Sequence, residues 1–129
     1  MATPGQILEV SKHYLTACIW ADCPEGTHPR APTAAQRAAF DTCKRFIDAH
    51  LDLFNDAMAR ADAGYGSHPD AGSAEAAFGH DLYLTTAGHG TGFWDRSELD
   101  AADLGERLTA ACEEFPAPEP TFYRGWLYL

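Results

Sequence analysis

The side chains that could do chemistry in this sequence gather between residues 80 and 96. Imidazoles and carboxylates bind zinc and transfer protons in enzymes, and this segment contains His80, Asp81, His89 and Asp95. In a β-hairpin, His80 or Asp81 would face Asp95, whereas His89 would lie a strand length away, roughly 20 Å. A three-ligand metal site is therefore unfavourable. A small hydrolase or nucleotide-binding protein that uses His80, Asp81 and Asp95 remains an alternative.

The elements that would position these side chains are predicted to be strands. Leu82 and Leu84 alternate with Tyr83 at the period of a half-buried strand, and the glycines at 88 and 90 suit a tight turn. The prediction is a hairpin over residues 82–94, preceded by a short helical turn that begins at Ser73 and ends before Gly79. The tail, residues 121–129, is predicted to be the third strand of this antiparallel sheet.

The segment reads H-D-x-x-x-T-x-x-G-H-G-x-G-F-W-D-R, which resembles a motif of small uncharacterised proteins from phages and mobile elements. The residues that carry the resemblance are His80, Asp81, Thr85, Gly88, His89, Gly90, Gly92, Phe93, Trp94, Asp95 and Arg96. It covers about residues 80–129, implies a hairpin followed by an acidic helix and a short strand, and brings no catalytic residues. Small acidic proteins of such elements are often inhibitors of host defence, so the resemblance implies an anti-CRISPR or anti-restriction role.

Three helices are predicted around the hairpin. Thr3, Pro4 and Gln6 form a capping box that begins a helix ending near Asp22. A second capping-box pattern at Thr33 predicts the longest helix, over residues 33–63, which pairs with the first. The third helix is predicted over about residues 98–115. The expected fold is α+β in a single domain, residues 1–129, with a helical hairpin, a small antiparallel sheet of about three strands and one further helix.

One flank of the predicted long helix is acidic. At about 100° per residue its aspartates fall within a sector of about 80°, and the last three repeat about every 6 Å, which resembles the phosphate spacing of a nucleic-acid strand. The opposite flank carries the apolar stripe of the core. A second acidic array lies on the third helix. The two arrays are Asp41, Asp48, Asp52 and Asp56, and Asp103, Glu106, Glu113 and Glu114. The alternative is a solvated surface that serves solubility.

The charge balance separates the two parts of the chain. The net charge is −10, with +1 over residues 1–45 and −11 over residues 46–129 when the charged residues are counted. Such a field repels nucleic acid and lipid headgroups and attracts basic protein surfaces. The sequence has no apolar run of membrane-spanning length and no signal-peptide pattern, so a cytoplasmic location in the host cell with reduced cysteines is expected.

The main functional prediction is therefore a non-enzymatic inhibitor without a cofactor. Its two acidic arrays would bind the basic surface of a host nucleic-acid-binding complex, of the CRISPR or restriction type, by mimicking nucleic acid. A homodimer would merge two such fields. The alternative is a protein-interaction module on the His80–Arg96 segment, in which Trp94, His89, Tyr83 and Trp126 are the anchors.

Overall fold

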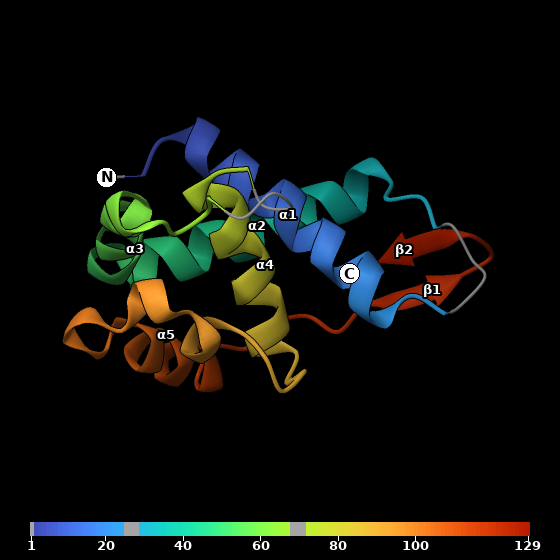
Figure 1. Ribbon diagram of the computed structural model, residues 1–129. Coiled ribbons are helices and arrows are strands. Elements are labelled where there is room, and N and C mark those ends of the chain that lie inside the picture. Colours follow the sequence, from blue (N-terminus) through green and yellow to red (C-terminus); the bar gives the residue numbers. More distant parts are fainter. Residues whose placement is uncertain (1, 25–28, 68–71) are drawn as a thin grey trace.

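The computed structural model describes residues 2–24, 29–67 and 72–129 and is mostly helical in those residues. A single small sheet, a two-stranded antiparallel hairpin, follows the helices (Figure 1). The elements are α1 (Pro4–Asp22), α2 (Thr33–Ala49), α3 (Leu51–Ala59), η1 (Arg60–Ala63), α4 (Ala74–Thr86), η2 (Phe93–Asp95), η3 (Ser97–Leu99), η4 (Ala101–Asp103), α5 (Leu104–Glu113), β1 (Thr121–Tyr123) and β2 (Trp126–Tyr128).

Helix α1 confirms the sequence prediction at both ends. The Thr3 hydroxyl accepts from the Gln6 amide at 3.1 Å, and the Gln6 side chain accepts from the Thr3 amide at 3.0 Å. This reciprocal cap satisfies two amides that have no partner within the helix. The helix ends at Asp22, before Cys23-Pro24.

The predicted helix over residues 33–63 is interrupted. His50, with φ −131° and ψ 44°, separates α2 from α3, and its amide donates back to the carbonyls of Phe46 and Ile47. The second capping box is also wrong, because Pro32 occupies the cap position and the Gln36 side chain donates to the Ala31 carbonyl instead. The apolar stripe of the two helices is confirmed as core: Cys43, Ile47 and Phe54 are fully buried, and Phe40, Leu51 and Met58 are partly buried against them.

The predicted hairpin over residues 82–94 is wrong. Ser73 does cap a helix, with its hydroxyl accepting from the Ala76 amide at 3.0 Å, but that helix, α4, continues through Gly79 to Thr86. It is buried on nearly every side, so its apolar residues show no helical periodicity that distinguishes it from a strand. Residues 87–92 form a loop, and Phe93–Asp95 form the short turn η2.

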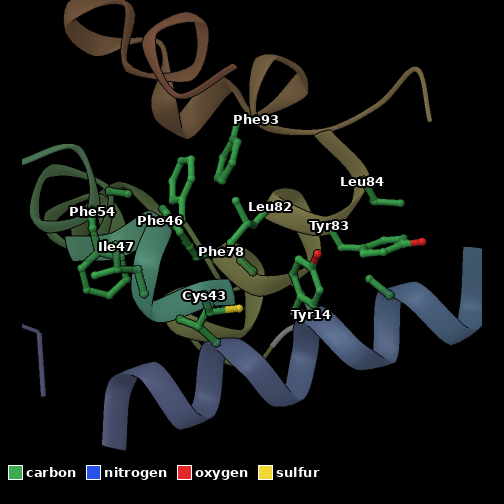
Figure 2. Packing of buried hydrophobic residues seen from close by; sticks show 14 of the residues in the cluster. Tyr14, Cys43, Phe46, Ile47, Phe54, Phe78, Leu82, Tyr83, Leu84 and Phe93 are labelled. Carbon is green, nitrogen blue, oxygen red and sulfur yellow. The ribbon is translucent and has the colours of Figure 1, made fainter. Parts of the chain in front are cut away.

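Helix α4 is the centre of the molecule, between α1 on one side and α5 on the other (Figure 1). Its Phe78 ring contacts Phe54 and Phe93, with centroid separations of 5.1 and 5.0 Å, and lies 6.2 Å from Phe46 (Figure 2). Side chains from α2, α3, α4 and η2 therefore form one aromatic cluster.

The C-terminal third also differs from its prediction. The helix expected over residues 98–115 begins with the turns η3 and η4, and α5 starts only at Leu104 because Ala102 and Asp103 have positive φ angles of 55° and 54°. The tail expected to be a third strand forms its own hairpin, in which Arg124 and Gly125 make the turn. Its β2 strand joins the segment before α2, because the Leu127 amide donates to the Arg30 carbonyl at 2.9 Å.

Two general expectations concern membranes and thiols. Every helix in the described part of the chain is too short or too polar to cross a lipid bilayer. Cys18, Cys43 and Cys112 are buried, as expected of small apolar side chains, and burial raises the pKa of the Cys18 thiol to about 11.

Candidate functional site

All eight residues of the two predicted acidic arrays have exposed side chains: Asp41, Asp48, Asp52, Asp56, Asp103, Glu106, Glu113 and Glu114. Asp48 forms an ion pair with Lys44, one helical turn earlier. The other seven have no ion pair with any residue that the structure describes. Glu113 and Glu114 lie at the C-terminal end of α5, where the helix dipole disfavours a negative charge by about 0.3–1 kcal/mol. The helix dipole therefore gives no stabilisation for Glu113 and Glu114, whereas Asp52 and Glu106 lie in the first turns of α3 and α5, where it favours a carboxylate.

Two residues of the first array line a groove. A cavity of about 630 Å³ separates the junction of α2 and α3 from α5. Asp48 and Asp52 line it on one side, and Arg107 and Ala110 line it on the other. The break at His50 bends the first array, so Asp41 and Asp48 lie on one helix and Asp52 and Asp56 on the next.

The second array lies on the same helix as one wall of this groove but does not line it. Glu106 precedes Ala110 by four residues and Glu113 follows it by three, so the three lie on one face of α5. The described residues that line the α5 side of the groove are Arg107, Ala110 and Ala111, and Glu106 and Glu113 lie beside them. Among the described residues that line the groove, Arg107 and His50 are the basic side chains.

The residues of the enzymatic alternative do not form one cluster. Asp81 is fully buried, and Arg96 donates to it twice, from Nε at 2.9 Å and from Nη2 at 2.7 Å, while the Tyr65 hydroxyl donates at 2.8 Å. Burial raises the pKa of Asp81, although the bonds from Arg96 and Tyr65 act in the opposite direction. Asp81 thus pairs with Arg96 and does not face Asp95.

Asp95 has a separate, local role. Its carboxylate accepts from the Thr91 hydroxyl at 2.6 Å and from the Gly92 amide at 3.1 Å, which closes the turn η2, and these two bonds lower the pKa of Asp95. His80 lies on α4 beside His13 of α1, with ring centroids 5.6 Å apart. A carboxylate that caps its own turn is a structural element, not a free general base.

His89 and Trp94, the two predicted binding residues of this segment, lie in different surroundings. His89 Nε2 is 2.8 Å from a carboxylate oxygen of Asp22, at the end of α1, and the same oxygen accepts from the Tyr83 hydroxyl. Trp94 lies on η2 against the start of α5 and is 39% exposed. Tyr83, expected to be a surface anchor, is buried instead.

A second cavity, which the sequence did not predict, lies at the ends of α1 and α4. Asp22, Tyr14 and Thr86 line it, together with Glu119 in the proline-rich segment after α5. The only signal was indirect: Pro116, Pro118 and Pro120 predict a stiff extended segment, but not what it covers.

In the described ranges, no three histidine, cysteine or acidic side chains converge as a metal site. The chain matches no known protein family, and no significant match was found among curated proteins or among solved structures.

Proposed function

We propose that this protein is a non-enzymatic inhibitor of a nucleic-acid-binding defence complex of the anti-CRISPR or anti-restriction type. It acts in the cytoplasm of the host cell and occupies a basic surface of its target by mimicking nucleic acid. The observation that carries the proposal is the set of seven exposed carboxylates without an ion pair among the described residues. Arginine and lysine side chains already placed for phosphates would find charged acceptors in them.

The groove between the α2–α3 junction and α5 gives this surface a shape. A basic helix or loop of the target would enter this groove and meet Asp48 and Asp52 on its α2–α3 side. Asp52 and Asp56 are one turn apart on α3, and Glu106 and Glu113 are two turns apart on α5. The bend at His50 turns the first row, so the match is to a curved basic surface and not to a straight one.

The proposal predicts that charge reversal of Asp48, Asp52 and Asp56 to lysine weakens target binding at least ~100-fold, because close charge pairs at an interface couple by ~1.5–7 kcal/mol each. The experiment is a pull-down from host lysate with wild-type protein at low and then high salt. The affinity of the captured complex for each variant is then measured.

The matched control reverses three other acids, Glu9, Glu75 and Asp100, which changes the net charge equally outside the groove. It should bind within a few-fold of wild type, and DNA should compete with the wild-type protein. Unchanged affinity in the first variant would contradict the proposal, as would equal losses in both.

A second candidate function is a protein-interaction module with aromatic anchors. The observation in its favour is the exposure of Trp94 and Trp126, each 39% exposed although large and apolar. In that case Trp94→Ala or His89→Ala would weaken binding and salt would have little effect. For the third possibility, an enzyme using His80, Asp81 and Asp95, the described contacts supply no supporting cluster.

A further inference from the structure

A second cavity, with a volume of about 520 Å³, lies between the ends of α1 and α4 and the segment that follows α5. Its size is within the ~300–1,000 Å³ typical of small-molecule sites. None of the eight residues of the acidic arrays lines it. What it binds is therefore a question separate from the groove.

The hydroxyl groups in this cavity are set to accept hydrogen bonds. The Tyr83 hydroxyl donates its proton to Asp22, and the Thr86 hydroxyl donates to the Leu82 carbonyl at 2.8 Å. Because each hydroxyl already donates its proton within the protein, both oxygens can accept a hydrogen bond from a ligand. The proline-rich wall is also poor in donors, because Pro116, Pro118 and Pro120 have no amide hydrogen.

The charge of the cavity is negative. Asp22 and Glu119 line it, and the described residues that line it include no lysine, arginine or histidine. The Asp22 oxygen Oδ2 accepts from Tyr83 and approaches His89, whereas its Oδ1 makes no hydrogen bond to the part of the chain that the structure describes. One carboxylate oxygen of Asp22 is therefore available to a ligand.

A buried hydroxyl also lines this cavity. Tyr14 is fully buried, and its hydroxyl, at the end of the ring that points away from α1, lies near the Thr86 hydroxyl but makes no hydrogen bond of good geometry within the described residues (Figure 2). Burial raises the pKa of Tyr14, so the group remains a neutral phenol. An unsatisfied buried polar group costs about 1–3 kcal/mol, and a donor that reaches the Tyr14 oxygen would offset part of that cost.

We propose that this cavity binds the guanidinium group of an organic cation. A guanidinium is planar, carries five N–H donors and no acceptor, and stacks on aromatic faces. The cavity supplies the complementary set: the Asp22 and Glu119 carboxylates, the hydroxyl oxygens, and the rings of Tyr83, Phe115 and Phe122. Either an arginine side chain of a partner protein or a free small guanidino compound can supply this group.

The test is an NMR titration with two guanidinium probes, agmatine and arginine blocked at both ends as N-acetyl and N-methylamide. Both should shift the amide signals of Thr86 and Ala117 saturably. The matched control is citrulline with the same blocking groups, a neutral urea of the same shape, which should bind at least about tenfold more weakly. Tighter binding of blocked arginine indicates a protein side chain as the source, and tighter binding of agmatine indicates a free compound.

Two variants locate the site. Glu119→Gln and Asp22→Asn should each weaken agmatine binding about tenfold, whereas the exposed Asp100→Asn should not change it. Glu119 is exposed, so that variant stays informative even if Asp22→Asn disturbs the fold, which circular dichroism checks. Equal binding of the citrulline control, or no saturable shift at millimolar probe, would overturn the inference. The triple reversal at Asp48, Asp52 and Asp56 should leave agmatine binding intact, which separates this result from the proposed function.

Discussion

The ion pair between Asp81 and Arg96 is the most consequential single contact. Asp81 is the one charged side chain that is fully buried among the described residues, and it accepts hydrogen bonds from two other segments. The pair joins α4 to the segment that follows η2. The hydrogen bond from Tyr65 to Asp81 also joins the segment after η1 to α4. Removing one partner of such a pair leaves the other without compensation.

We expect Asp81→Asn to lower the free energy of unfolding by about 2–4 kcal/mol. The loss is below the ~3–5 kcal/mol of a fully buried pair, because the Arg96 side chain is 39% exposed and can be rehydrated. Urea denaturation measures it, with the exposed Asp100→Asn as control, expected within ~0.5 kcal/mol of wild type. The double variant Asp81→Leu with Arg96→Met should recover part of the loss. A loss below ~1 kcal/mol in Asp81→Asn would show that the pair is not structural.

For single residues, the sequence indicated which polar side chains would make specific contacts, but not which residues they would contact. Asp81, His89 and Asp95 stand out as polar groups in an apolar segment, and all three form specific contacts. Their partners depend on whether the chain is a strand or a helix. On a strand Asp81 would face Asp95, but on α4 it faces Arg96. The exposure of the acidic residues was easier to predict, because it follows from the local helical periodicity and does not depend on distant contacts.

Among the elements, α4 depends on a close approach to α1. An added Cβ at Gly79 would lie 2.2 Å from the Val10 carbonyl oxygen and 2.9 Å from the Tyr14 amide nitrogen. Both are backbone atoms, which cannot move aside as a flexible side chain can. Glycine is therefore required at 79 because a neighbouring helix occupies the space, even though it weakens the helix itself.

Gly79→Ala should consequently destabilise the protein by about 1–3 kcal/mol or more, through overpacking between α1 and α4. Gly5→Ala is the matched control, because its Cβ would meet only the Thr3 hydroxyl at 3.9 Å. That change should be neutral or stabilise by up to ~1 kcal/mol, as alanine favours a helix. Thermal unfolding followed by circular dichroism compares the two. Equal melting temperatures would contradict the close packing of these helices.

The elements that the sequence predicted well are those with local signals. The cap of α1 and the apolar stripe of α2 and α3 are encoded within a few residues, and both are confirmed. Helix α4 lacked such a signal, because it is covered on nearly every side and its Leu82, Tyr83 and Leu84 fit a strand equally well. The sequence predicted that the helical turn ends before Gly79, whereas this glycine lies within α4 and leaves room for the backbone of α1.

For the whole molecule, charge is the dominant property. The net charge of −10 is concentrated after residue 45, and the carboxylates flanking the groove repel one another. Such self-repulsion lowers stability and is screened by salt, since the Debye length falls from ~30 Å at 0.01 M to ~8 Å at 0.15 M.

We expect the melting temperature to rise when the salt concentration increases over that range. The triple reversal at Asp48, Asp52 and Asp56 adds two charges per site, so the net charge changes from −10 to −4, and the rise should be smaller in that variant. Scanning calorimetry at matched protein concentration measures both. A melting temperature that falls with salt, or an equal rise in both proteins, would show that the acidic surface is not self-repelling.

The concave features of the whole molecule were beyond prediction. The groove depends on how α3 and α5 lie relative to each other. The second cavity depends on residues 115–120 passing over the ends of α1 and α4. Such placements follow from tertiary packing, which no short sequence window contains. The acidic composition predicted a surface, but not its concave shape.

The packing of α1 against α4 also bears on how the chain is made. The two helices are distant in sequence: Tyr83 and Asp22, which contact each other, are 61 residues apart. A ribosome that adds ~5–20 residues per second needs about 3–12 s to synthesise that interval. Throughout that time the apolar face of α1, with Val10, Tyr14 and Ala17, has no α4 to cover it. We therefore expect a newly made chain to expose this apolar face until α4 has been synthesised.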